Sequence, residues 1–137
     1  MNGFENFLLE DFEDIDSVEK VIKIGGKNKT MIFRPISAAL GDDIRKKCRK
    51  VTFTKGQKMY ETDQDRYISN LIIETTVCPD LKNAELQKNW GVIGAEQLLE
   101  SMKSKMLDGE YSTWGNIVSS VNGYDKGMEE LMDDAKN

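Results

Sequence analysis

Histidine is absent from the 137 residues of the chain. Without it, there is no imidazole base, no Cys–His or Ser–His nucleophile pair, and no zinc site with a histidine ligand. Gly26-Lys27 lacks the other residues of a phosphate-binding loop, and the acidic clusters around Asp14 and Asp63 lack the spacing and central glycine of a calcium loop. We therefore predict that the protein is not an enzyme and uses no cofactor and no metal.

Cysteine is scarce, and long apolar runs are missing. Cys48 and Cys78 have no CxxC context, which predicts two unpaired, small apolar side chains in a reducing compartment. The sequence does not open on a basic region followed by an apolar run, so we expect no signal peptide. No apolar run approaches the roughly 18 residues that indicate a membrane span, so we expect no membrane partner.

Basic residues are outnumbered by acidic ones, 19 to 24, and the formal net charge is -5. This charge argues against a nucleic-acid partner, because general affinity for nucleic acids comes mainly from neutralising phosphates. A length of 137 residues fits one domain. We expect an acidic amphipathic segment over residues 1–17, a single globular domain over 18–124, and an acidic tail over 125–137.

The stretch from Asp65 to Leu81 is expected to organise the core. Its apolar side chains recur with the 3.6-residue period of a buried helix, at Tyr67, Ile68, Leu71, Ile72 and Thr75. Asp63 is placed to cap the first turn. Pro79 lacks a backbone donor and disfavours the helical conformation of the residue before it, so it ends the helix. The β-branched run over 75–77 predicts an extended exit.

Residues 18–36 are expected to form a β-hairpin. Ile22 and Ile24 alternate with Lys23, Met31 and Phe33 alternate with Ile32, and the glycine-containing loop 25–29 lies between them. An isolated hairpin is marginal in water. This one must therefore pack on the helices or extend a sheet in an assembly.

Four more helices are indicated by apolar periodicity. They are predicted over 38–50, 83–90, 94–106 and 111–121. Ser37 suits the cap of the first, whose buried stripe runs from Leu40 to Val51, and Lys55 and Lys58 lie in the loop that follows. Asp108-Gly109 is interpreted as a turn. The predicted fold is α+β and mostly α, with an N-terminal β-hairpin packed on a bundle of about five helices.

Both termini carry apolar side chains among acids. Near the N-terminus these are Phe4, Phe7, Leu8 and Phe12, in an amphipathic pattern. This segment either packs on its own domain, docks into a partner's groove, or is disordered. The tail, with Met128, Leu131 and Met132, is either a frayed helix or a docking peptide. We predict partner-contacting positions at Phe4, Phe7, Leu8, Phe12, Tyr111 and Trp114, although Trp114 also suits a core position.

A basic cluster follows the predicted cap at Ser37. It comprises Arg45, Lys46, Lys47, Arg49 and Lys50. It is interpreted as a solvated face, a phosphate or RNA patch, or a surface for an acidic protein. Residues 45–58 contain seven bases and no acid, and residues 1–19 contain seven acids and no base. These blocks attract one another within or between chains, so we expect self-association that weakens with salt and a folded monomer after deletion of 1–16.

Several short strings, taken in order, resemble a known family. They are Phe33-Arg34-Pro35-Ile36-Ser37, Val77-Cys78-Pro79-Asp80-Leu81-Lys82-Asn83, Glu85-Leu86, Trp90-Gly91-Val92, Leu98-Leu99, Leu107-Asp108-Gly109-Glu110-Tyr111 and Asn122-Gly123-Tyr124. The chain resembles the XkdN-like phage tail assembly chaperones over roughly residues 20–124. One departure is Asp108, where that family often places a proline before Gly-Glu.

The resemblance implies a role in binding rather than catalysis. Such chaperones coat the long tape measure protein of a tailed phage or prophage and keep it soluble until tail tube subunits polymerise around it. The expected partners are therefore the tape measure protein, other copies of the chain and the tail tube protein, in the cytoplasm of the bacterial host. The alternatives are a structural component of the tail or baseplate, or another small acidic adaptor.

Overall fold

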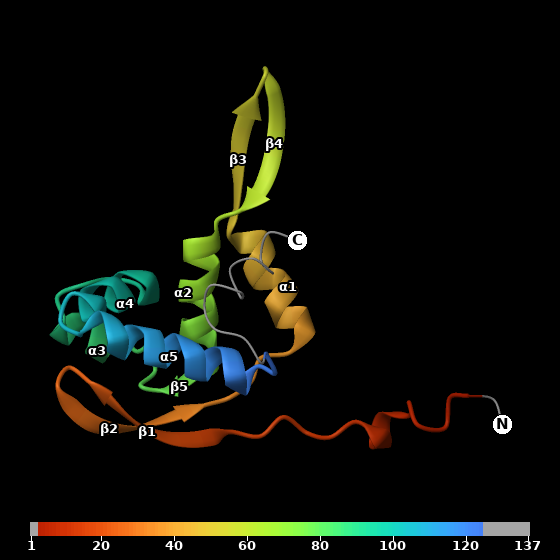
Figure 1. The fold of residues 1–137 in the computed structure, drawn as a ribbon, viewed down its shortest axis with the longest axis horizontal. Coiled ribbons are helices and arrows are strands. Elements are labelled where there is room, and N and C mark those ends of the chain that lie inside the picture. The colour runs from red at the N-terminus through yellow and green to blue at the C-terminus, as the bar shows by residue number, and fades with distance from the viewer. Residues whose placement is uncertain (1–2, 125–137) are drawn as a thin grey trace.

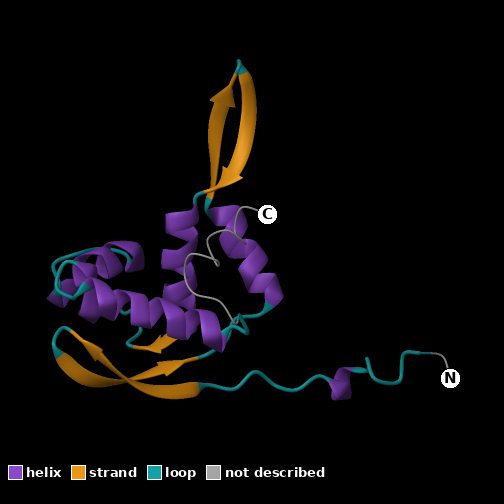
Figure 2. Ribbon diagram, in the orientation of Figure 1, coloured by secondary structure: helices purple, strands orange, loops and turns teal. Residues whose placement is uncertain are grey.

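The structure is a computed structural model that describes residues 3–124; residues 1–2 and the predicted tail at 125–137 lie outside the described residues. Figures 1 and 2 show the arrangement of its elements. In chain order they are η1 (Leu9–Asp11, a 3-10 helix), β1 (Val18–Ile24), β2 (Lys27–Phe33), α1 (Ala38–Lys47), β3 (Arg49–Thr54), β4 (Gln57–Thr62), α2 (Gln64–Thr75), β5 (Thr76–Cys78), α3 (Ala84–Asn89), α4 (Ala95–Lys103) and α5 (Asp108–Val121).

Helix α2 lies at the centre of the fold, in contact with α1, α4, α5 and β5. All five positions of its predicted apolar stripe are buried. The Asp63 side chain accepts a hydrogen bond from the Arg66 N–H at 3.2 Å and caps the helix. The chain then leaves α2 as the extended strand β5, before the cis peptide bond between Cys78 and Pro79. The predicted central helix, its cap and its extended exit are confirmed.

The predicted N-terminal hairpin is present as β1 and β2, and it packs on the helices as part of a three-stranded sheet within the chain. Ile24 lies opposite Lys27, so the turn contains only Gly25 and Gly26, at φ 64° and 84°. Two positive φ angles in succession match the twist of the flanking strands and favour glycine. The predicted five-residue loop is therefore too long. β5 pairs with the other edge of β2, and α5 packs against β1 (Figure 1).

Helix α1 is shorter than predicted. The Ser37 hydroxyl accepts a hydrogen bond from the Leu40 N–H at 3.1 Å, which confirms the predicted cap. The helix ends at Lys47 and not at residue 50, because buried Cys48 turns the chain into β3. Val51 consequently lies on a strand and is 45% exposed, so its predicted place in the buried helical stripe is wrong.

A second hairpin, β3–β4, occupies the region predicted as a loop after α1. Its strands pair from Arg49 opposite Thr62 to Thr54 opposite Gln57. The turn is Lys55-Gly56, again with two positive φ angles. The hairpin stands away from the helices (Figure 2), and we refer to it as the projecting hairpin.

The start of α5 corrects a second prediction. Asp108 and Gly109 do not form a turn between helices, because they are the first two residues of α5. Asp108 suits this position, since a negative charge interacts favourably with the N-terminal end of a helix dipole. The proline that the family often carries there also suits the first helical position. Helix α4, in turn, ends at Lys103 and not at residue 106.

One cluster of buried side chains joins the sheet to the helices. It includes Phe33 of β2, Leu71 of α2 and Leu98 of α4. Both cysteines are free thiols; Cys48 belongs to this core, whereas Cys78 is exposed. The fold is mixed α+β, with an N-terminal strand pair followed by helices, as predicted in outline. The projecting hairpin adds strands that the predicted helical bundle did not contain.

Candidate partner-binding surfaces

An apolar groove lies where the three-stranded sheet meets α3, α4 and α5. The groove has a volume of about 320 Å³. Three methionines line the groove: Met31 from β2, Met102 from α4, and Met106 just beyond α4. We call it the methionine groove. Its other lining residues are Ile24, Gly25, Lys29, Thr30, Cys78, Pro79, Leu86, Trp90, Lys105 and Trp114.

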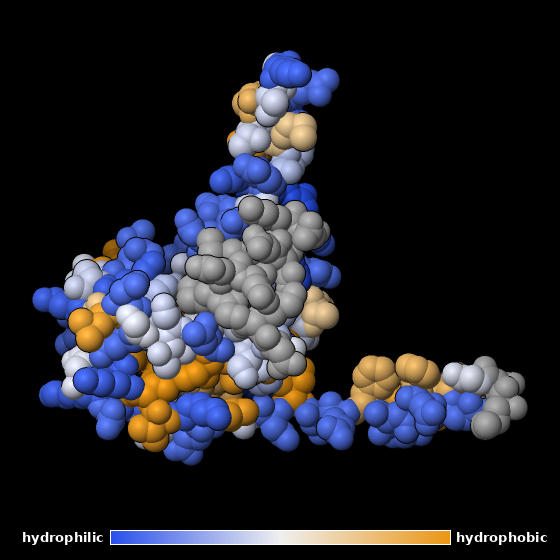
Figure 3. Space-filling model, in the orientation of Figure 1, coloured by the Kyte–Doolittle hydropathy of each residue, from blue (hydrophilic) through white to orange (hydrophobic). Residues whose placement is uncertain are grey.

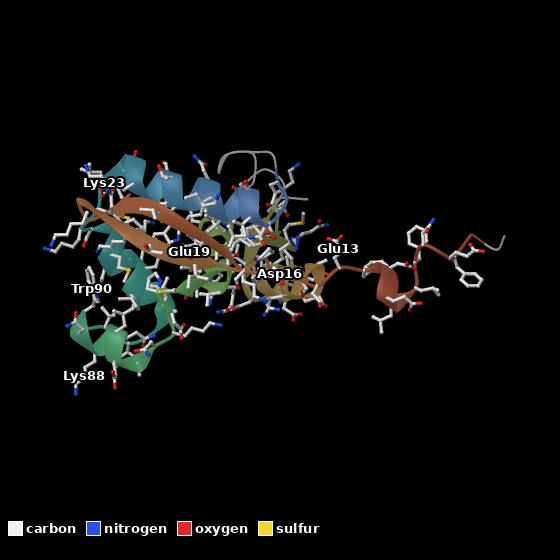
Figure 4. All side chains as sticks on the ribbon, turned by 90° about the horizontal axis from the view of Figure 1, so that it is seen from below. Glu13, Asp16, Glu19, Lys23, Lys88 and Trp90 are labelled. Carbon is white, nitrogen blue, oxygen red and sulfur yellow. The ribbon has the colours of Figure 1, made fainter. Side chains whose placement is uncertain are left out.

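The methionine groove has a buried base and a partly exposed rim. Met31 and Trp114 are buried, whereas Trp90, Met102 and Met106 are partly exposed. Figure 4 shows Trp90 at the end of the body opposite the N-terminal segment, so that segment of the same chain does not cover the groove. Methionine side chains adapt to irregular apolar surfaces. The groove can therefore accept apolar side chains from a partner helix.

A carboxylate clamp at Glu110 holds one border of the groove in place. Its Oε1 accepts hydrogen bonds from the backbone N–H groups of Leu107 at 2.8 Å and Gly25 at 3.2 Å, and Oε2 accepts one from Gly26 at 3.2 Å. The Leu107 N–H holds the pKa of Glu110 below its usual value against the effect of burial, and the two glycine N–H groups lower it further. The clamp ties the β1–β2 turn to the start of α5.

Replacing Glu110 with Gln is expected to lower the thermal midpoint near neutral pH, because the amide N–H₂ group faces a backbone donor. The pKa of Glu110 is lower in the folded than in the unfolded protein. Its contribution to stability is therefore complete above the unfolded pKa of about 4.3 and is lost as the pH falls through the folded value. In thermal melts, the difference in thermal midpoint between the two proteins should become smaller as the pH is lowered. A difference that does not change with pH would contradict this role.

A partly buried polar network fixes α1, α2 and α4 to one another. The Asn70 amide donates to Glu96 Oε1 at 2.6 Å, and its Oδ1 accepts from Lys47 Nζ at 3.0 Å. Arg66 Nε donates to the same Glu96 oxygen at 2.9 Å. The hydrogen bonds from Asn70 and Arg66 hold the pKa of Glu96 below its usual value. The network joins the helices, and we assign it a structural role.

A larger hollow of about 530 Å³ lies beside α2, α4 and Tyr111, but its polar groups are engaged with one another. Arg66 pairs with Glu96, and Lys103 Nζ lies 3.2 Å from a Glu100 oxygen. Lys103 Nζ also lies 4.6 Å from the centre of the Tyr111 ring, and burial raises the pKa of that tyrosine. The lining of this hollow is mostly polar and charged, so we prefer the methionine groove as a binding site.

The two aromatic positions predicted on α5 are separated by the fold. Tyr111 is partly exposed at the polar hollow. Trp114 is only 1% exposed, and its Nε1 donates a hydrogen bond to the Thr76 hydroxyl at 3.0 Å. The structure thus places Trp114 in the core, as the alternative interpretation of this residue had it. We no longer include it among the proposed contact residues.

The N-terminal segment extends away from the body as an arm, which we define as residues 3–17 (Figure 1). Its large apolar side chains are exposed, Phe7 by 72% and Phe12 by 66%, and Phe4 and Leu8 are exposed as well. Only the single turn η1 is helical. The interpretation that this segment packs on its own domain is therefore wrong. A docking role for these side chains stays a prediction.

The predicted basic cluster is divided between two elements. Arg45 lies over the Tyr67 ring, 5.5 Å from its centre, and Lys47 belongs to the Asn70 network. Lys46 is exposed on α1. Arg49 and Lys50 lie on β3, where Lys50 Nζ is 3.8 Å from a Glu61 oxygen. The exposed positive charge of the cluster is therefore shared between α1 and the projecting hairpin.

Two surfaces were not identified from the sequence. The methionine groove combines residues of β2, α3, α4 and α5, which are far apart in the chain. The only feature of the sequence that pointed to such a surface was its methionine content. The projecting hairpin exposes Val51, Phe53 and Tyr60. Its signal was the alternation of Val51 and Phe53 before a Lys-Gly pair.

The described residues contain no group of three or more His, Cys, Asp or Glu side chains that could hold a metal ion. Among the helices within residues 3–124, none is long and apolar enough to cross a membrane.

Comparisons with known proteins find similar sequences. The model of the family described as "Phage XkdN-like tail assembly chaperone protein, TAC" matches residues 4–136. The chain is 30% identical over 107 residues to YqbN of Bacillus subtilis (strain 168), covering 77% of this chain and 70% of YqbN. It is 26% identical over 107 residues to "Phage-like element PBSX protein XkdN" of the same strain, covering 77% of this chain and 71% of that one.

The fold has a solved counterpart. The crystal structure of YqbN superposes with a TM-score of 0.67 at 23% identity, covering 91% of this chain and 99% of that chain. The family match spans the arm, the sheet and all the helices. It is a family of tail assembly chaperones and not of enzymes, which implies contact with phage tail proteins. The chain therefore belongs to the XkdN-like phage tail assembly chaperone family.

Proposed function

We propose that the protein is a chaperone that binds the tape measure protein of a phage or prophage and keeps it soluble in the host cytoplasm during tail assembly. The observation that carries the proposal is the methionine groove, which residues 3–124 leave open, in a chain of a tail assembly chaperone family. The function also includes self-association and contact with the tail tube protein as the tube replaces the chaperone.

The groove suits an apolar segment of a long helical partner. Side chains spaced at i, i+3 and i+4 on such a segment enter the space between Trp90, Met102 and Met106. The flexible methionines repack around different side chains, so successive segments of one partner bind to many copies. Lys29 and Lys105 in the lining give complementary charge for acidic residues that flank such a segment. This work needs no catalytic group.

The test is co-expression with the tape measure protein of the same tail. The variant Met102→Gln with Met106→Gln keeps the length of both side chains but makes them polar. Burying a methionine contributes about 1.5–3 kcal/mol, so we expect tape measure binding to weaken at least about tenfold and its soluble fraction to fall to the level without chaperone. Centrifugation reports the soluble fraction of the tape measure protein, and a pull-down reports its binding.

Ile93→Gln is the matched control, because Ile93 is 91% exposed and lies outside the groove lining. It should solubilise the tape measure as well as the unchanged protein, and both variants should keep their thermal midpoints within a few degrees. A groove variant that still solubilises the tape measure would overturn the groove as its binding site. Finding the protein in finished tails would overturn the chaperone role in favour of a structural component.

A further inference from the structure

The projecting hairpin carries an apolar face that the described part of the chain leaves uncovered. Val51 pairs with Tyr60, and Phe53 pairs with Lys58. Because paired residues share a face and alternate residues of a strand return to it, Val51, Phe53 and Tyr60 lie together on one side. They are 45%, 73% and 58% exposed. Figure 3 shows apolar side chains on the hairpin away from the body.

The same hairpin is incomplete as a sheet. Its order is β3-β4 alone, so both outer edges are open, and the described helices and other strands make few contacts with it. A two-stranded hairpin is marginal in water, and three strands or a packed face are needed for independent stability. A partner on the apolar face would supply that packing.

The charge of the projecting hairpin indicates the kind of partner that its apolar face would bind. Residues 49–62 carry four bases and one acid, namely Arg49, Lys50, Lys55, Lys58 and Glu61. Arg49 and Lys58 lie on the same face as the apolar side chains. The surface is thus apolar with a basic border, and it fits an acidic segment with spaced aromatic side chains.

The N-terminal arm has these properties. Its exposed apolar side chains include Phe4, Phe7 and Phe12. Residues 3–17 also carry six acids and no base, namely Glu5, Glu10, Asp11, Glu13, Asp14 and Asp16. Figure 4 shows Glu13 on the arm, just beyond the edge of the body.

We propose that the arm of one copy of this chain docks on the Val51–Phe53–Tyr60 face of the projecting hairpin of a second copy. The phenylalanines supply most of the affinity, since exposed ion pairs contribute only about 0–1 kcal/mol each. The carboxylates facing Arg49 and Lys58 set the direction of the arm and speed association.

The geometry favours two copies over one. The arm and the projecting hairpin leave the body in different directions (Figure 1). Each copy therefore presents a donor arm and an acceptor hairpin to other copies. Such a contact is head-to-tail, so it closes into a ring or continues as a filament. Repeated copies in either arrangement would present their methionine grooves side by side, although the docking does not depend on tape measure binding.

Light scattering of the full-length protein across a salt series tests the docking. We expect oligomers at low ionic strength that dissociate as the screening length falls to about 3 Å at 1 M salt. Phe7→Asp with Phe12→Asp in the full chain should weaken association at least about tenfold without changing the thermal midpoint of the body. A protein that is monomeric at low salt, or an arm variant that still assembles, would overturn the proposal.

A charge exchange makes the test specific. Arg49→Glu with Lys58→Glu makes the hairpin acidic, and Glu10→Lys with Glu13→Lys reduces the negative charge of the arm and adds bases. Each variant alone should associate much more weakly than the unchanged protein, because the hairpin variant sets acids against the acidic arm and the arm variant loses two of the carboxylates that attract the basic hairpin. Mixing the two should restore assembly, since the unchanged arm of the first meets the unchanged hairpin of the second. A mixture that stays monomeric would show that the arm and hairpin do not meet.

Lys27→Glu with Lys88→Glu is the control for total charge, because both side chains are exposed and lie outside the projecting hairpin and the arm. It changes the net charge as much as the hairpin variant does, and it should assemble as the unchanged protein does. Loss of assembly in this control would assign the salt effect to overall charge. The tape measure assay with the groove variant is independent of all these outcomes, so each proposal can fail alone.

Discussion

Replacing Leu71 with Ala is expected to lower the free energy of unfolding by about 2–5 kcal/mol. Leu71 lies in the middle of α2 and is 2% exposed, within the core cluster that joins the sheet to the helices. The substitution removes apolar contacts and leaves a cavity that the surrounding side chains fill only in part. Domains of this size are stable by about 5–15 kcal/mol, so the loss is a large share of the total.

Urea melts of the two proteins measure this loss, with Ile93→Ala as the control. Ile93 is almost fully exposed, so its truncation should change stability by less than about 0.5 kcal/mol. If Leu71→Ala were equally mild, α2 would not be the centre of the core, and the interpretation of its apolar stripe would be lost.

The central part of the fold was predictable because its signals are local. The apolar stripe of α2, the cap at Asp63 and the stop at Pro79 each follow from residues close in sequence. The first hairpin was predictable for the same reason, since two glycines separate two alternating runs. In both cases, burial of one face agrees with the sequence pattern.

The projecting hairpin was missed because that agreement is absent. Val51 and Phe53 alternate as a strand requires, but their face is solvent-exposed, and Met59 lies on the opposite face. An apolar residue on each face blurs the alternation. Cys48 and Val51 also continue the helical spacing of Leu40, which extended the predicted helix past its true end at Lys47.

The candidate site depends on contacts between distant parts of the chain. Glu110 is bound to Gly25 and Gly26, 85 and 84 residues away, and no local pattern predicts that pairing. The same holds for Met31, Trp90 and Met106, which meet only after the sheet and helices have packed. The sequence supported the exposed arm as one of several alternatives, and the structure removes only the alternative in which the arm packs on its own domain.

The second large effect is expected at Trp114. It is buried against β5, and its Nε1 donates to the Thr76 hydroxyl at 3.0 Å. Trp114→Ala should cost about 3–5 kcal/mol, through lost packing and a cavity at the base of the methionine groove. Trp114→Phe should cost less, because it keeps most of the apolar contact and loses mainly the hydrogen bond to Thr76, worth about 0.5–1.5 kcal/mol, plus a smaller cavity.

Urea melts of these two variants, together with the tape measure assay, separate a core residue from a contact residue. A core role predicts a graded loss of stability from Phe to Ala, with Trp114→Phe still solubilising the tape measure. A direct contact predicts lost solubilisation in both variants, including a Trp114→Phe protein that is still folded, since the side chain would then also serve the partner. That second result would mean that Trp114 leaves the core when the groove is occupied, and it would return Trp114 to the contact residues.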